Sequence, residues 1–309
     1  MLRKEKQSTQ SHDAHEQHHQ ENFLKGEDHL YHHKNKDCVS YQMFLRHVGI
    51  LKPLLKDKNK WLTIGDFTGL EASYLSEQNQ DATASDISDV YLKEAFEQNW
   101  IKKYIKINVE QIDLEENEFD YLFCKEAFHH FPRAYLGLYE MLRVAKKGVI
   151  MIEPVDVLCK MPLLLFLKNI CDCFNPYLIN KIWKNRFSWE TVGNYVFKIS
   201  DREIEKIAMG LGLSCIAFKE MNTRLAPVPA KWGDSKKIPL DEKLYKKLKR
   251  KLAVWNFFCR LRIIPYNTLG AIIFKEKPQN TLLNDLRKEK YRIIELPSNP
   301  YINDDPIAK

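Results

Sequence analysis

The chain has 309 residues, of which 44% are hydrophobic, and it carries a formal net charge of +7. Its length exceeds the roughly 100–200 residues of one ordinary domain, so we expect an enlarged domain or a core with an accessory region. No stretch approaches the roughly 20 apolar residues that cross a bilayer, and the polar first 20 residues lack the apolar centre of a secretory signal.

The number and spacing of the cysteines bear on the cellular compartment. There are seven, and only Cys171 and Cys173 lie close together. An odd, scattered set argues against a disulfide framework and is typical of a reducing environment. We therefore expect a cytoplasmic protein.

The first 37 residues are polar and hold seven of the ten histidines. Pairs such as His15/His18 and His29/His32 have spacings that can bind a metal, but few apolar residues are present to fix their geometry. Residues 1–37 are accordingly predicted to be a disordered His-rich tail, without a metal site.

A regular alternation of short apolar segments and amphipathic segments begins at residue 61. Strands are expected at 61–65, 82–86, 104–108, 119–124 and 149–153, with helices at 70–77, 90–99 and 132–145. Pro132 opens the last of these helices, and Gly148 lies just past its end. Strands and helices alternating at this spacing predict an α/β fold with a parallel sheet wound by right-handed crossovers.

The regular alternation of strands and helices ends at residue 154, and from there on we divide the chain by its composition. A domain over 38–278 is expected to contain a lid-like apolar insertion at 155–200 and a basic helical insertion at 221–267. Ser200 and Glu203 form a capping-box motif that opens a helix ending near Gly210. Two further strands are expected at 213–219 and 269–274, and residues 279–309 are expected to be a peripheral tail.

The positive charge is concentrated in one segment. Residues 231–262 contain eleven Lys/Arg and three Asp/Glu, so the remainder of the chain is close to neutral. A helix is expected from about residue 240 to 258. Its cationic side could simply be solvated, could contact a membrane surface, or could bind an anionic ligand.

Three turns follow successive predicted strands and point to a nucleotide site. The first holds Gly65, Asp66 and Gly69, whose glycines let the backbone approach a ligand. Asp86 ends the second strand 21 residues after Gly65, close to the separation at which a carboxylate binds a ribose; it could instead cap the helix that follows. The third turn follows the third strand and can read the edge of an adenine. The expected contacts of the second and third turns are Asp86, Ile87, Asn108, Val109 and Glu110.

The core resembles the class I S-adenosylmethionine-dependent methyltransferases of the small-molecule type. The resemblance lies in WLTIGDFTGLEASYL, ATASDIS, KINVEQIDLEENEFDYLF and CKEAFHHFPRAYLGLYEMLRVAKKGVIMIEP. It implies a Rossmann-like seven-stranded sheet with the last strand antiparallel, S-adenosylmethionine as cofactor, and methyl transfer to an acceptor. Phe67 stands where the family often has a glycine, so a catalytically silent nucleoside-binding protein of this fold is an alternative.

The loop after the fourth strand is expected to face the transferable methyl group. Lys125 is expected to contact the cofactor, His129 or His130 to act as a base, and Glu126 to orient that base. The acceptor is expected to be a small molecule or glycan/lipid-like, methylated on oxygen, and no obligate protein partner is evident. An RNA acceptor is a less favoured alternative, because KEAFHH lacks the Asn/Asp-Pro-Pro-aromatic signature of base-methylating relatives.

Overall fold

The computed structural model describes residues 2–26, 28–174, 177, 188–190, 193–223 and 242–299, with side chains from residue 11 onward except those of 158 and 159. The parts of the two predicted insertions at 178–187 and 224–241, and the end of the predicted C-terminal tail from residue 300, lie outside the described residues.

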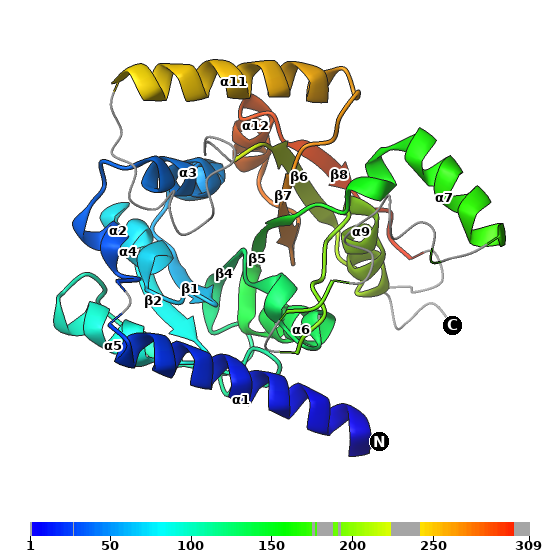
Figure 1. The fold of residues 1–309 in the computed structure, drawn as a ribbon. Helices are drawn as coiled ribbons and strands as arrows, with labels where there is room; N and C mark the ends of the chain where they lie inside the picture. The colour runs from blue at the N-terminus through cyan, green and yellow to red at the C-terminus, as the bar shows by residue number, and fades with distance from the viewer. Residues whose placement is uncertain are drawn as a thin grey trace, which may run out of the picture.

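The described residues form one eight-stranded sheet with the order β3-β2-β1-β4-β5-β7-β6-β8 (Figure 1). The first five strands in this order are parallel, and β7 runs antiparallel to both of its neighbours. The strands are β1 (Lys60–Ile64), β2 (Asp81–Asp86), β3 (Tyr104–Lys106), β4 (Phe119–Lys125), β5 (Ala145–Pro154), β6 (Cys215–Met221), β7 (Thr268–Phe274) and β8 (Arg292–Glu295). The α/β, Rossmann-like fold expected from the sequence is therefore confirmed.

The structure adds one strand to the expected seven. β8 pairs antiparallel with β6 at the edge of the sheet, and it lies in the segment that composition alone assigns to a peripheral tail. Its short pattern RIIE is too brief to stand out in a charged segment, and the pairing with a strand some 75 residues away supplies the missing information.

Helices cover both faces of the sheet. The helical segments are α1 (Leu2–Leu24), α2 (Tyr31–Lys34), α3 (Val39–Val48), η1 (Gly49–Leu54), α4 (Leu70–Glu77), α5 (Val90–Glu97), η2 (Phe128–His130), α6 (Ala134–Val144), η3 (Val157–Lys160), α7 (Pro162–Phe174), α9 (Asp201–Gly210), α11 (Glu242–Arg260) and α12 (Asn280–Lys288). The capping box that opens α9 is confirmed, because the Glu203 N–H donates to Ser200 Oγ and the Ser200 N–H donates to the Glu203 carboxylate.

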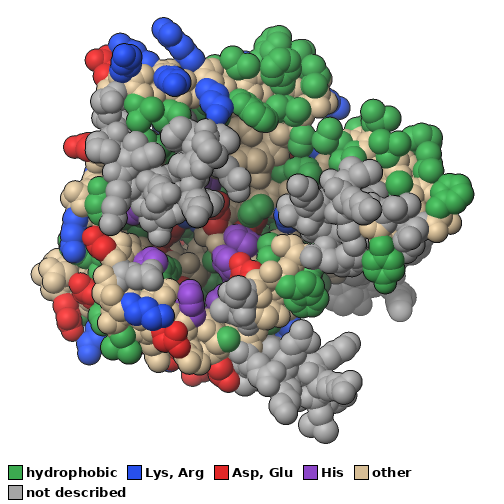
Figure 2. Space-filling model, in the orientation of Figure 1, with side chains coloured by type: hydrophobic (Ala, Val, Ile, Leu, Met, Phe, Trp, Pro, Cys, Tyr) green, Lys and Arg blue, Asp and Glu red, His purple; other side chains and the backbone are tan. Residues whose placement is uncertain are grey.

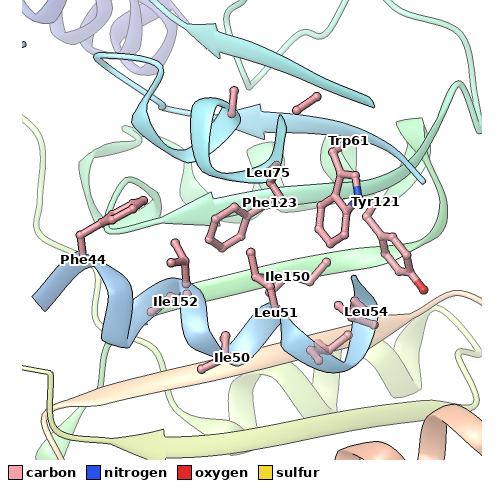
Figure 3. Close-up of a cluster of buried hydrophobic side chains, with 14 of the residues drawn as sticks. Phe44, Ile50, Leu51, Leu54, Trp61, Leu75, Tyr121, Phe123, Ile150 and Ile152 are labelled. Carbon is pink, nitrogen blue, oxygen red and sulfur yellow. The ribbon is translucent and has the colours of Figure 1, made fainter. Parts of the chain in front are cut away.

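Successive residues of each central strand point to opposite faces of the sheet and feed two separate cores. Trp61 of β1 and Phe123 of β4 pack with α3, α4, α5 and η1, in the cluster shown in Figure 3. Leu62 and Leu122 pack on the other face with α6 and α9. This double burial fixes the strand register and so fixes which turns meet at the carboxyl edge.

The first 37 residues differ from the expectation of disorder. Residues 2–24 form α1, which crosses the carboxyl edge of the sheet (Figure 1). Its contacts are largely polar: Glu16 pairs with Lys106, and His19 lies beside Asp86. Phe23 adds one edge-on aromatic contact with Tyr91. Hydrophobic periodicity could not reveal a helix that is held in this way.

Gly148 illustrates a second difference from the expected elements. α6 ends at Val144, so Gly148 lies inside β5 rather than just past a helix. A Cβ atom at Gly148 would lie 2.5 Å from the carbonyl oxygen of Ile273 on β7. The glycine is therefore required by the close approach of two strands.

We predict that Gly148→Ala lowers the free energy of unfolding by about 1–3 kcal/mol, because the added methyl group must displace the β7 backbone. Gly210→Ala is the matched control, since a Cβ there meets nothing within 4 Å, and it should leave stability unchanged or slightly raised. Equal denaturation midpoints for the two variants would refute this account of the β5–β7 contact.

Candidate active site

A cavity of about 750 Å³ opens at the carboxyl ends of the parallel strands. Its walls come from the ends of β1, β2 and β4, from the turn after β3, from α1, and from residues 189–190. Figure 2 shows histidine side chains gathered around this hollow. This is the edge at which open α/β sheets bind their ligands.

The structure brings some of the predicted site residues to this cavity and directs others into the protein. Those that line it are Gly65, Asp86, Ile87, Val109, Lys125, Glu126 and His130. Those not among its lining residues are Asp66, Gly69, Asn108, Glu110 and His129. Each of the three predicted turns thus contributes to one shared cavity.

Asp66 shapes the first turn from within. Its buried carboxylate accepts hydrogen bonds from the Thr63 hydroxyl at 2.8 Å and from the N–H groups of Glu71 and Ala72 at 3.2 and 2.9 Å. Burial, together with the nearby Glu71 charge, raises the pKa of Asp66. The side chain therefore holds the start of α4, and Gly69, with φ +75°, makes the preceding turn.

Glu71 is a cavity residue that sequence reasoning missed. Its carboxylate pairs with Lys125 Nζ at 2.9 Å, and both side chains line the cavity. Burial would raise the pKa of Glu71, but the Lys125 charge outweighs burial and the pKa is lowered. The only sequence signal was its place in the first turn of the helix after the glycine loop.

Asp86 keeps its carboxylate at the cavity. It is 6% exposed, and Oδ1 accepts the Ser88 N–H at 3.0 Å and lies 3.5 Å from His19 Nδ1. α5 starts later, at Val90, with Asp89 at its N-cap position. Asp86 therefore does not cap that helix, which was the alternative interpretation of this residue.

In the third turn Val109 lines the cavity, while the polar side chains of Asn108 and Glu110 form hydrogen bonds within the protein. Asn108 Oδ1 accepts the Glu110 N–H at 3.0 Å. The buried Glu110 carboxylate accepts the N–H and Nε–H of Arg133 at 2.6 and 2.7 Å, and His12 Nε2 lies 3.3 Å from it. Both side chains fix the shape of the turn.

Glu126 is placed differently from the expected orienting role. It has a left-handed backbone, φ +51°, which is uncommon for a residue with a side chain. Its carboxylate lies 3.6 Å from His47 Nε2 and 3.9 Å from Lys125 Nζ. Burial would raise the pKa of Glu126, but these two partners lower it to about 2.

Glu153, at the end of β5, anchors the loop that follows β4. Its carboxylate is fully buried and accepts the N–H groups of Ala127 and Phe128 at 2.9 and 2.8 Å. The other carboxylate oxygen lies 2.7 Å from His129 Nδ1. Burial would lower the pKa of His129, but the Glu153 charge raises it above its ordinary value. His129 is thus part of the loop's support.

His130 faces the cavity from the same loop. Its Nδ1 lies 2.8 Å from a carboxylate oxygen of Glu190, which also lines the cavity. Burial would raise the pKa of Glu190, but the hydrogen bond with His130 lowers it. The orienting carboxylate for this histidine is therefore Glu190, which no motif in the sequence singled out.

Histidines of α1 close one side of the cavity. His12, His15, His18 and His19 line it, and the spacing of His12, His15 and His19 places them on one side of the helix. Burial lowers the pKa of His15, which lies 3.1 Å from Asn194 Oδ1. Among the described residues, no group of three His, Cys, Asp or Glu side chains is arranged to hold a metal ion.

Phe67 lines the cavity wall without filling the cavity. Its ring lies 4.3 Å from the His19 ring and 4.7 Å from the Tyr91 ring, measured between centroids. The side chain takes part in an aromatic wall between α1 and α5, and the cavity of about 750 Å³ remains beside it.

A model of protein families matches this part of the chain. The match covers residues 62–152 and is described as a methyltransferase domain. Residues 62–152 are a methyltransferase domain. The resemblance seen in the sequence is thereby confirmed over these residues, and S-adenosylmethionine is the cofactor that such a domain implies.

Several solved structures of methyltransferases are similar to this chain at low sequence identity. An S-adenosylmethionine-dependent methyltransferase from Archaeoglobus fulgidus is 14% identical, with 76% of this chain and 93% of that chain covered and a TM-score of 0.46. A second one, from Aquifex aeolicus, is 16% identical, with 77% of this chain and 94% of that chain covered and a TM-score of 0.42. The magnesium protoporphyrin IX methyltransferase of Synechocystis with bound SAH is 13% identical, with 76% of this chain and 84% of that chain covered and a TM-score of 0.43. None of the curated proteins compared with this chain matches it.

The cavity fits the cofactor that this domain implies. Its volume lies within the roughly 300–1,000 Å³ of small-molecule sites. It offers a carboxylate at Asp86, apolar side chains at Ile87 and Val109, and an ion pair at Glu71 and Lys125. These groups match the ribose, the adenine and the charged amino-acid end of S-adenosylmethionine in chemistry.

We predict that His129→Gln lowers the free energy of unfolding by about 1–3 kcal/mol at pH 6, because it leaves a buried carboxylate without its charged partner. The folded-state pKa is raised above 6.5, so the ion pair stabilises fully below pH 6.5. That stabilisation is lost as the pH rises through the folded-state pKa.

Chemical denaturation at pH 6 and pH 9 measures this effect. The difference between wild type and His129→Gln should shrink at the higher pH. His130→Gln is the control, because the His130 side chain is 38% exposed. It should lower the free energy of unfolding by less than about 1 kcal/mol. A pH-independent difference for His129→Gln would contradict the ion-pair assignment.

Proposed function

We propose that the enzyme transfers a methyl group to a hydroxyl oxygen of a small-molecule or glycan/lipid-like acceptor, with His130 as the general base. The observation that carries this proposal is the pair formed by His130 and Glu190 at the cavity. A histidine that lines the site and is oriented by a carboxylate is suited to remove a proton.

The cofactor-binding roles follow from the positions of the side chains. Asp86 would accept hydrogen bonds from the ribose hydroxyls. Ile87 and Val109 would pack against the adenine, and the Glu71–Lys125 pair would bind the amino and carboxylate groups. When bound, S-adenosylmethionine supplies a methyl group on a positively charged sulfur. Holding the acceptor in line with that group accounts for much of the rate enhancement.

His130 is suited to take the proton that the acceptor hydroxyl loses. Its Nδ1 is engaged with Glu190, so the neutral ring carries its proton on Nδ1 and has a lone pair on Nε2. After proton transfer to Nε2, the imidazolium would be stabilised by the Glu190 carboxylate. His129 is less suited to this role, because its raised pKa and its pairing with buried Glu153 favour the protonated form.

The acceptor side of the cavity supports a bulky substrate. Trp189 lines the cavity next to Glu190 in sequence and is 60% exposed. An exposed aromatic face can pack against a sugar ring or an apolar chain. Trp189 and Glu190 are therefore proposed to form the acceptor-facing wall.

We predict that Asp86→Ala weakens S-adenosylmethionine binding about 10–100-fold in titration calorimetry, through loss of the ribose contact. Asp89→Ala is a matched control on the same turn, since its side chain forms no capping hydrogen bond with α5. Unaltered affinity of the Asp86 variant, with its fold intact by circular dichroism, would remove the proposed ribose site.

We predict that His130→Ala lowers turnover about 10²–10⁴-fold while the affinity for S-adenosylmethionine stays within a factor of two or three. Glu190→Gln should lower turnover less and shift the pH–rate profile. Mass spectrometry of a cell extract incubated with the enzyme and a donor bearing a deuterated methyl group identifies the acceptor for this assay. Full activity of His130→Ala, or a product labelled on nitrogen or carbon, would exclude base-assisted O-methylation.

A further inference from the structure

α7 carries an apolar stripe that nothing described in the protein covers. Five of its apolar residues have spacings that place them on one side of the helix. They are Leu163, Phe166, Leu167, Ile170 and Phe174. Leu163 is 72% exposed and Phe174 84%, and none of the helix residues is buried.

The orientation of α7 is opposite to that of an ordinary surface helix. Lys168 and Asp172 form an ion pair at 2.7 Å and are less exposed than the apolar stripe. A surface helix normally turns its apolar side to the core and its charged side to water. Here a short helix turns five large apolar side chains outward, which is typical of an interaction surface.

α11 also exposes apolar side chains to solvent, and it carries positive charge as well. Leu248 and Leu252 are buried against Val39 and Met43 of α3, so one side of α11 is fixed to the protein. On the opposite side a line of exposed residues with helical spacing runs the length of the helix. In order, these are Lys243, Lys247, Arg250, Val254, Phe257 and Phe258.

The outward side of α11 is therefore cationic in its first half and apolar in its second. From Glu242 to Arg262 the sequence has eight Lys/Arg and one acidic residue, a local charge equal to the +7 of the whole chain. Within the described part of the chain, Lys243, Lys247 and Arg250 form no ion pair. Leu261 and Ile263 extend the exposed apolar half beyond the helix.

Both apolar stripes lie on the same part of the molecule. Figure 2 shows hydrophobic side chains over the C-terminal half of α11 and over α7 in its upper right part, and Lys/Arg side chains over the N-terminal half of α11. We propose that this amphipathic surface, formed by the outward sides of α7 and α11, binds an anionic lipid bilayer. The apolar stripes would enter the headgroup–acyl boundary, and the cations would contact acidic headgroups.

The same features disfavour two other occupants. A two-fold symmetric contact that packs α11 antiparallel against its copy would set the cationic half of one helix against the apolar half of the other, so the cations would have no acidic partner. RNA would engage the cations and could stack on the aromatic rings, but it gives no reason for the exposed aliphatic residues Leu163, Leu167 and Ile170 of α7. Among the described residues, no helix is long and apolar enough to cross a membrane, so the bilayer contact proposed here is interfacial.

The test is co-sedimentation of the full-length protein with two kinds of vesicle. One is phosphatidylcholine alone, and the other is phosphatidylcholine with about 30% phosphatidylglycerol, which gives a strongly anionic surface. We expect binding to the anionic vesicles, weakened by added salt, and at least about tenfold weaker binding to the neutral ones. Equal binding to both vesicle types, or none to either, overturns the proposal.

Two double variants assign the surface. Lys247→Glu/Arg250→Glu and Phe166→Ser/Phe257→Ser should each weaken binding to anionic vesicles about tenfold or more, with unchanged circular dichroism and melting temperature. Lys93→Glu/Lys102→Glu makes the same change in charge on the α5 side of the molecule, away from α11 (Figure 1), and should bind as wild type does.

Other outcomes decide against a bilayer. Undiminished vesicle binding by either surface variant overturns the assignment. A wild-type dimer that becomes monomeric in Phe166→Ser/Phe257→Ser, without vesicle binding by either, identifies a second copy as the occupant. A salt-sensitive RNA gel shift lost in Lys247→Glu/Arg250→Glu, again without vesicle binding, identifies RNA. The assay needs no turnover, so its failure leaves the proposed methyl transfer untouched.

Discussion

The buried Glu153 carboxylate is the contact on which the arrangement of the active site depends. It lies at the end of β5 with no exposed surface. It accepts hydrogen bonds from two backbone N–H groups of the loop after β4, and it pairs with an imidazole nitrogen of the same loop. A buried charge must be matched by several donors, and here a single short loop supplies them. The loop is thereby fixed so that Glu126 and His130 both face the cavity.

Pairs of polar side chains on either side of that loop complete the site, and they come from distant parts of the chain. Lys125 meets Glu71 of α4, His130 meets Glu190 of the segment after β5, and Asp86 meets His19 of α1. The sheet supplies an edge where these groups can meet, while the pairings set which side chains reach the cavity. α1 is held by the same polar chemistry, and it forms part of the wall although it lies outside the matched methyltransferase domain.

Sequence reasoning was strongest where the signal is local. The alternation of strands and helices, the capping box at Ser200, and the carboxylate that ends β2 could each be identified within a few residues. It failed where a partner is remote: the loop histidines find their carboxylates 24 and 60 residues away. The orienting role predicted for Glu126 rested on proximity along the chain, but its carboxylate lies 3.6 Å from Nε2 of His47, a residue far away in the sequence.

Hydrogen–deuterium exchange with and without S-adenosylmethionine tests most directly whether these separate turns form one cofactor site. The account predicts that the cofactor slows exchange together in the backbone segments 63–69, 85–88, 107–110 and 125–131, and in residues 11–24 of α1. Protection confined to a single one of these segments, or located away from the carboxyl edge of the sheet, would contradict it.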